Sequence, residues 1–519
     1  MTIKDKIRIK FPELVFIFFW LKRVLHFSDS QKKSKKIINV IKENRANKRE
    51  INEGIVLMPI YDDFATMRII FEYQKKIFNN NLKQIRYYYV LTSVDTTLKI
   101  ELSKGLLRFI FKAIHFFELR KISKIYDINF YDIIASNFQF KPKKQFYYFQ
   151  SKEALLSYKY KEILIGDLIY DTYLRFRGKP TIDLTDPELI RIFNLAHKLV
   201  DYWEYTFIKF KIKMIFQPYV SYIHWGIVSR TAINKKIDVI LFGNSYYNLI
   251  KLNENYLYHT KNFNLYPKIF ETLNDKSNRI IEAASKIDKR LKGDISETKY
   301  MNKSAFWGNP NSDFSLESNL PKAVVFLHDF FDSPHCYGDL IFPDFYDWIL
   351  HILKFAKSNK GILYLIKPHP NALEENNPIV KNLEVEYKCE NIIFLPKTVT
   401  NIDIINTRPS VIFTVYGTVA HEFAYLGFPV VTAGSNPHSA YDFVYNPKSV
   451  NELEFYLSNV GSFSLPQNYS KDKILEFYYM HYLYYSAEYN FNNCNPFKDM
   501  NLGEVDLPID STIEKLLFN

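Results

Sequence analysis

Three short apolar runs in the second half of the chain each end at polar residues, and helical patterns lie between them. The runs cover 362–366, 411–414 and 430–433. Short apolar strands that alternate with helices are typical of a parallel sheet. The carboxyl ends of parallel strands share one edge of the sheet, and ligands bind at that edge. The pattern therefore predicts an α/β domain with a binding site at the strand ends.

The residues at these strand ends suit a negatively charged nucleotide. Lys367 and His369 follow the first run in the sequence Lys-Pro-His-Pro, whose prolines stiffen the chain. Gly417 and Thr418 follow the second run and open a helix, whose free N–H groups attract anions. Glu422 lies one turn later, where its carboxylate could accept hydrogen bonds from ribose hydroxyls. The alternatives are a histidine satisfied within a turn, a threonine that only caps the helix, and a solvated glutamate.

A second polar cluster follows a strand predicted at 323–327. It runs from His328 to His335 and includes Asp329 and Asp332. Either aspartate could act as a general base or a nucleophile, and the sequence does not choose between them. Capping of the turn is the main alternative, and a metal site is a less favoured one.

The first half of the chain carries a third group of candidates. Asp167, Asp171 and Arg175 are spaced for one face of a helix, beside Tyr170 and Tyr173. An acidic and aromatic surface suits a sugar acceptor, and Asp171 is also a catalytic candidate. The alternative is a capped helix with an internal ion pair.

The order of the predicted elements divides the chain into two α/β units. Strands are predicted at 55–58, 86–91, 213–216 and 239–242, and helices at 187–209 and 222–232. A last helix is predicted from Lys471 to Tyr489, packed back on the first domain. The predicted divisions are a basic leader at 1–50, an acceptor domain at 51–260, a helical linker at 261–318, a nucleotide-sugar domain at 319–465 and a helical segment at 466–519.

The basic leader predicts a contact with a membrane surface. The chain has a net charge of +12, and part of the excess lies in the first fifty residues around the apolar run Leu14–Leu21. This run is too short to cross a bilayer, since a spanning helix needs about 20 residues. Aromatic residues flanked by Lys and Arg suit a helix in the membrane interface, and packing on the protein body is an equal alternative. We expect a cytoplasmic protein with peripheral contact at the inner face of the cytoplasmic membrane.

The cysteines indicate the compartment of the protein, and the placement of the basic residues bears on nucleic acid as a partner. The three cysteines are scattered and lack metal-ligand spacing, so a reducing compartment fits best. The basic residues are concentrated in the leader without a recognisable nucleic-acid module, which argues against nucleic acid as a partner.

Six segments of the sequence form a recognisable set of motifs: Leu327–Asp329, Phe342–Trp348, Ile366–Pro370, Tyr416–Thr418, Glu422 and Gly427–Pro429. Together they resemble bacterial glycosyltransferases of capsule and lipopolysaccharide biosynthesis, most of all the Kdo transferases. The His-Pro pair is also shared with bacterial sialyltransferases and glycerophosphate polymerases.

The resemblance implies a GT-B fold, in which two Rossmann-like domains face each other across a cleft. It also implies a nucleotide-activated sugar donor, often CMP-linked, with no required cofactor and no essential metal. By position, His369 would lie at the donor phosphate, and Asp329 or Asp332 would take part in catalysis.

The sequence thus predicts a glycosyltransferase that moves a sugar, such as CMP-Kdo or another CMP-linked sugar, to a surface-polysaccharide or lipid-linked acceptor. The rival interpretations are a CDP-polyol phosphotransferase, a sugar-nucleotide epimerase and a non-catalytic scaffold of capsule assembly. Donor screening, product analysis and nucleotide binding, respectively, would separate them.

Overall fold

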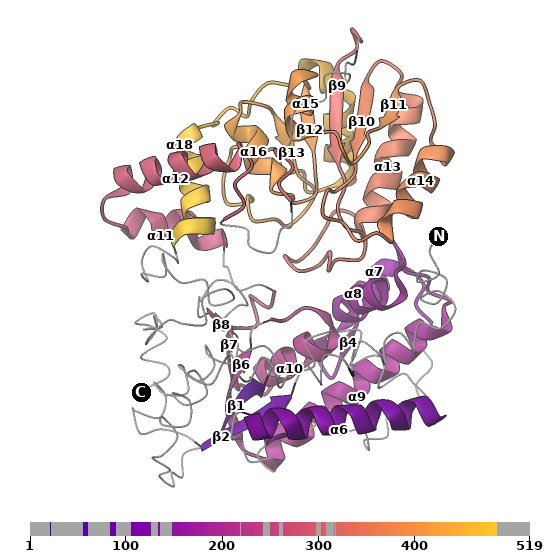
Figure 1. Cartoon of the computed structure of the whole chain (residues 1–519), viewed down its shortest axis with the longest axis vertical. Coiled ribbons are helices and arrows are strands. Elements are labelled where there is room, and N and C mark those ends of the chain that lie inside the picture. Colours follow the sequence, from indigo (N-terminus) through magenta and orange to yellow (C-terminus); the bar gives the residue numbers. More distant parts are fainter. Residues whose placement is uncertain are drawn as a thin grey trace.

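The computed structural model describes two α/β domains (Figure 1). Most of the leader and the end of the chain after residue 484 lie outside the described residues. Within the described residues, no helix is both long and apolar enough to cross a membrane. The described residues are 21, 55–60, 84–89, 105–125, 133–134, 148–217, 219–241, 250–258, 263–296, 303–307, 316 and 318–484.

The first domain contains a six-stranded sheet in the order β3-β2-β1-β6-β7-β8. Every pairing is parallel except that of β8. The strands are β1 (Ile55–Ile60), β2 (Gln84–Tyr89), β3 (Ile133–Ile134), β6 (Ile212–Gln217), β7 (Asp238–Leu241) and β8 (Ile250–Leu252). Among the described residues, a small hairpin and five helices accompany this sheet. They are β4 (Lys159–Tyr160), β5 (Ile163–Leu164), α6 (Gly105–Ile125), α7 (Lys152–Leu156), α8 (Gly166–Arg177), α9 (Pro187–Lys209) and α10 (Tyr222–Asn234).

The second domain contains a five-stranded, fully parallel sheet in the order β11-β10-β9-β12-β13. Its strands are β9 (Lys322–Phe326), β10 (Leu363–Lys367), β11 (Ile392–Phe394), β12 (Val411–Phe413) and β13 (Val430–Val431). In each sheet the first strand lies in the middle. The next two strands are added on one side of it, and the chain then crosses over to add the remaining strands on the other side. This is the Rossmann order, and it creates a switch point between β1 and β6 and another between β9 and β12.

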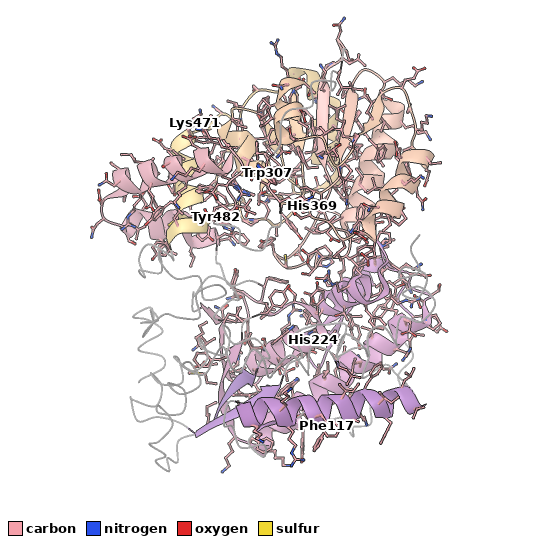
Figure 2. All side chains as sticks on the ribbon, in the orientation of Figure 1. Phe117, His224, Trp307, His369, Lys471 and Tyr482 are labelled. Atoms are coloured by element: carbon pink, nitrogen blue, oxygen red, sulfur yellow. The ribbon has the colours of Figure 1, made fainter. Side chains whose placement is uncertain are left out.

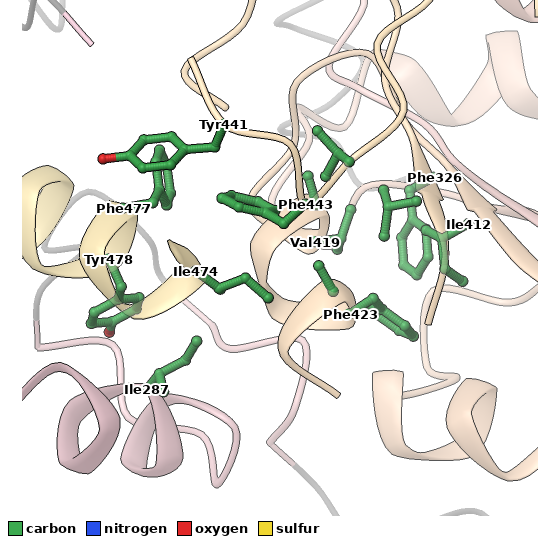
Figure 3. Close-up of a cluster of buried hydrophobic side chains, with 14 of the residues drawn as sticks. Ile287, Phe326, Ile412, Val419, Phe423, Tyr441, Phe443, Ile474, Phe477 and Tyr478 are labelled. Carbon is green, nitrogen blue, oxygen red and sulfur yellow. The ribbon is translucent and has the colours of Figure 1, made fainter. Parts of the chain in front are cut away.

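Side chains alternate between the two faces of the second sheet, as the pleat of a strand requires. Val324 and Phe326 enter one core, whereas Ala323 and Val325 enter the other. Figure 3 shows part of the first core, where α12, α16 and α18 meet. The helices on that face are α11 (Tyr266–Thr272), α12 (Lys276–Arg290), α15 (Asn401–Asn406), α16 (Val419–Tyr425) and α18 (Lys471–Tyr478). Those on the other face are α13 (Phe345–Ser358), α14 (Asn376–Glu386) and α17 (Val450–Ser458).

Two segments contribute to this core in ways that the sequence did not indicate. The segment 263–296, predicted within a linker, places Tyr266 and Ile287 in the core of the second domain. The prediction that the last helix returns to the first domain is wrong for the described residues. Ile474 and Phe477 of α18 are apolar residues that pack with α16 and α12 instead. Both residues therefore belong to the core on one face of the second sheet.

The two domains meet where α8 approaches the start of α13 (Figure 1). Asp344 caps α13 by accepting a hydrogen bond from the Asp347 N–H at 2.8 Å. Its other carboxylate oxygen accepts the hydroxyls of Tyr170 at 2.6 Å and Thr181 at 2.5 Å. One buried carboxylate therefore both starts a helix of the second domain and holds the first domain against it.

Candidate interdomain active site

The loops after β9 and β12 are joined at the switch point of the second domain. His328 follows β9, and its Nε2 accepts the Val415 N–H at 3.1 Å and lies 3.1 Å from the Thr414 hydroxyl. Burial, with a small contribution from His369, lowers the pKa of His328 to about 3. The ring is therefore neutral at physiological pH, which leaves Nε2 free to accept.

Gly417 is required by the close approach of the chain at this point. Its N–H donates to the Thr414 hydroxyl oxygen at 3.2 Å, and a Cβ at this position would lie 2.9 Å from the same atom. Thr418 precedes α16, and its side chain makes no capping hydrogen bond. The predicted anion contact of both residues stays a prediction.

His369 lies after β10, at the edge of the second domain that faces the first (Figure 2). Its Nδ1 accepts the Asn371 N–H at 3.2 Å, so the neutral ring carries its proton on Nε2. Burial lowers the pKa of His369, Asp329 opposes the shift, and Lys397 and Lys367 add to it. The side chain is thus a neutral N–H donor. A phosphate that binds beside it would favour the protonated form of the ring.

The ammonium group of Lys367 is held by backbone carbonyl groups of the protein. Its ammonium donates to the carbonyl oxygens of Pro396 and Lys397, at 3.2 Å each. Burial lowers its pKa to about 8. In this structure Lys367 supports the loop after β11, and its predicted contact with phosphate stays untested.

Glu422 lies in a buried ion pair. Its Oε1 accepts the Nε of Arg290 at 2.6 Å, and both side chains are almost fully buried. The guanidinium also lies over the ring of Tyr482. The alternative of a solvated helix glutamate is therefore wrong, because Arg290 of α12 covers this face of α16. The contact with ribose stays a prediction.

The two aspartates that the sequence could not separate have different environments. Asp329 accepts three hydrogen bonds, from the Phe331 N–H at 2.9 Å, the Asn376 side chain at 3.0 Å and the Leu373 N–H at 2.9 Å. This carboxylate holds two loops together. Asp332 is exposed, and within the described residues its carboxylate accepts one hydrogen bond, from the N–H of the adjacent Ser333 at 3.0 Å.

Asp332 lies where the switch points of the two domains face each other. The charge of Asp332 contributes to the raised pKa values of Tyr219 and Tyr222, which follow β6 in the first domain. Although the Asp332 side chain is exposed, the protein atoms around its carboxylate keep part of the water away and raise its pKa; Asp329 adds to this, and Arg175 partly opposes it. Tyr222 has a φ of 64°, a conformation that is rare without glycine and often found at functional sites.

The predicted acidic face of α8 is largely buried. Asp167 pairs with Arg230 through two contacts of 2.5 and 2.6 Å, which tie α8 to α10. Asp171 is 3% exposed, and its Oδ1 lies 2.6 Å from the Nδ1 of His335 in the second domain. Only the half-buried Arg175 retains access to solvent among the three predicted acceptor residues. Their roles in acceptor binding stay predictions.

The Asp171–His335 contact predicts a pH-dependent contribution to stability. Burial disfavours the charged ring of His335, but Asp171 outweighs this and raises the His335 pKa above 6.5. Burial also raises the pKa of Asp171, against the effect of His335. Both groups therefore bind a proton more tightly in the folded state than in the unfolded state. The stabilisation from His335 is fully present below the pKa of the unfolded histidine and is lost as pH rises through the pKa of His335 in the folded protein.

We therefore expect the stability difference between the wild type and His335→Gln to be larger at about pH 6 than at about pH 8.5. Urea unfolding at the two pH values measures it. A difference that does not change with pH would contradict the prediction.

Sequence reasoning missed the partners that define this site. Arg290, Tyr219 and Tyr222 were not among the predicted site residues, and His335 was only the end of a polar cluster. Asp344 before a helical pattern was a recognisable capping signal. In the described part of the chain, no group of three or more His, Cys, Asp or Glu residues is arranged to hold a metal.

No family model matches this sequence, and no curated protein matches it. Among solved structures, the KpsC beta Kdo 2,4 transferase of Thermosulfurimonas dismutans is 12% identical, with a TM-score of 0.30, and the match covers 51% of this chain and 87% of that one. A UDP-GlcNAc 2-epimerase of Neisseria meningitidis is 10% identical, with a TM-score of 0.23 and coverage of 84% and 100%. The wall teichoic acid polymerase TagF is 12% identical, with a TM-score of 0.21 and coverage of 94% and 98%. At these TM-scores the similarities carry no argument about activity.

Proposed function

We propose that this chain is a GT-B-type glycosyltransferase that acts on a nucleotide-activated sugar between its two domains. The observation that carries the proposal is the position of Asp332 at the switch point of one domain, opposite Arg175 and Tyr222 of the other. Ligands of doubly wound sheets bind at such switch points. Two that face each other provide one place for a donor and one for an acceptor.

The donor would bind to the second domain with its phosphate at His369. The Nε2–H of a neutral imidazole donates to a phosphate oxygen, and protonation of the ring then stabilises the departing nucleotide. We favour a CMP-linked sugar as the donor because of the sequence resemblance. Glu422 would contact the ribose only if Arg290 shares its carboxylate, since this ion pair occupies Oε1.

The acceptor would approach from the first domain, where Arg175 and Tyr222 lie near Asp332. With a raised pKa, Asp332 could remove a proton from an acceptor hydroxyl or act as a nucleophile. Asp329 is the weaker candidate because three hydrogen-bond donors already satisfy its carboxylate. We propose a surface-polysaccharide or lipid-linked glycan as the acceptor.

Nucleotide binding is the first test of this assignment. CMP, CDP and UDP are each added to the full chain, and the melting temperature is measured. At a nucleotide concentration of 100 Kd, binding to the folded state adds about 2.7 kcal/mol of stability and raises the melting temperature. A melting temperature that none of the three changes would favour the scaffold alternative.

Replacement of His369 by alanine is expected to lower turnover by about 10²- to 10³-fold without unfolding the protein, because a donor aimed at developing charge is lost. Transfer from a CMP-linked sugar to a matched acceptor measures this effect. His351→Ala is the control, because His351 lies on α13 and contacts Glu454 away from the site. Equal loss of activity in both variants would contradict a specific role for His369.

Product analysis addresses the rival enzymes. An epimerase would convert the nucleotide sugar without any acceptor, and a CDP-polyol phosphotransferase would use CDP-linked donors and retain a phosphate in its product. Neither rival is favoured by a particular contact in the described residues.

A further inference from the structure

Helix α6 has large apolar side chains on a buried face and also on an exposed face. Phe111 and Ile114 are buried. Leu106, Phe109 and Phe117 are 74%, 70% and 63% exposed. A helix with large apolar side chains on two faces is normally covered on both. The exposed side chains are large and adjacent, and such patches mark interaction surfaces.

The exposed residues form one continuous surface, because their spacing repeats with the helical period. Positions 106, 109, 113, 116 and 117 share a face at 3.6 residues per turn. The rings of Phe116 and Phe117 also contact each other edge to face, with centroids 6.1 Å apart. We call Leu106, Phe109, Phe116 and Phe117 the α6 surface. Figure 1 shows α6 along the side of the first domain that is away from the second, and Figure 2 labels Phe117 there.

The charged residues of the same helix are mostly positive. Its sequence contains five Lys or Arg residues and one acidic residue. Arg120 and Lys124 are exposed and continue the α6 surface toward the end of the helix. Lys112 is half-buried beside it. Long basic side chains can lay their methylene groups on an apolar surface while their charged ends reach outward.

We propose that the α6 surface docks on an anionic lipid bilayer. Aromatic and aliphatic side chains on one face of a helix, with Lys and Arg beside them, suit insertion at the boundary between headgroups and acyl chains. Basic residues near the surface add attraction to anionic headgroups. A second copy of the chain is a poorer partner, because it would bring two basic helices together.

This surface is distinct from the leader predicted at 1–50, and the proposal does not depend on the proposed enzyme activity. It assigns membrane contact to a helix within the first domain. A protein docked in this way would have its first domain between the bilayer and the interdomain site (Figure 1).

Co-sedimentation of the full chain with lipid vesicles tests the proposal. We expect binding to phosphatidylcholine vesicles that contain phosphatidylglycerol, weaker binding to phosphatidylcholine alone, and a loss of binding as salt is raised. The double variant Phe109→Ser/Phe117→Ser is expected to bind at least about tenfold more weakly, because two apolar rings no longer leave water. Phe455→Ser is the matched control, since Phe455 of α17 is 64% exposed on the second domain and should not affect binding.

Circular dichroism and urea unfolding of each variant check that the fold is retained. Because both substituted rings are exposed, the double variant is expected to fold as the wild type does. Wild-type vesicle binding by the folded double variant would overturn the proposal and leave the leader as the membrane contact. A change in oligomeric state with unchanged vesicle binding would overturn it in favour of a second copy.

Discussion

Replacement of Asp332 by asparagine is expected to lower kcat by about 10²- to 10⁴-fold, the range usually lost with a general acid or base. The carboxylate is exposed and makes one local hydrogen bond, so the substitution removes the charge with little effect on the fold. Steady-state transfer from a nucleotide sugar measures the loss. The wild-type rate should rise with pH through the Asp332 pKa, which lies above the ordinary 3.8, if Asp332 is the base.

Asp329→Asn is the matched control for this prediction. It should mainly reduce stability, because the new amide nitrogen would face N–H groups whose hydrogen bonds the carboxylate now accepts. Because Asp329 is only half-buried, each lost hydrogen bond is expected to cost about 0.5–1.5 kcal/mol. The assignment would be reversed if Asp332→Asn kept full turnover while folded Asp329→Asn had none.

Replacement of Arg290 by alanine is expected to destabilise the protein by about 3–5 kcal/mol, because it leaves the buried carboxylate of Glu422 without a partner. Both side chains are about 4% exposed, so water cannot easily replace the guanidinium. Urea unfolding measures the loss of stability. A loss of less than about 1 kcal/mol would show that the pair is not the buried contact described here.

The double variant Arg290→Met/Glu422→Leu separates structure from ligand binding. Replacing both charges with apolar side chains is often neutral for stability, so folding should recover relative to Arg290→Ala. If Glu422 also binds ribose, the folded double variant will lose the thermal shift with CMP or CDP. If the shift is retained, Glu422 serves only the ion pair with Arg290.

Local signals in the sequence were sufficient for much of the secondary structure. The helix predicted at 187–209 is α9, Pro187–Lys209 in the structure, and Asp186 caps it by accepting the Glu188 N–H. Capping depends on atoms within one helical turn, so a short window of sequence contains the information. The apolar runs likewise predicted β10 and β12, because strands buried on both faces have continuous apolar sequences.

The partners of the site residues could not be found in this way. Asp171 and His335 are 164 positions apart, and Arg290 and Glu422 are 132 apart. The phosphate contact predicted for Lys367 stays a prediction, and its two acceptors in the loop after β11 could not be foreseen from the sequence. Such pairings depend on how packed elements approach each other, and no periodic pattern along the chain encodes that approach.

The sequence by itself determined the α/β class and the placement of polar residues at the strand ends, because strand patterning and turn chemistry are local properties. Only the tertiary structure decided that Asp329 is held by three donors while Asp332 remains open between the domains. The reason is that the environment of a carboxylate comes from neighbours distant in sequence, and folding brings them within hydrogen-bonding distance.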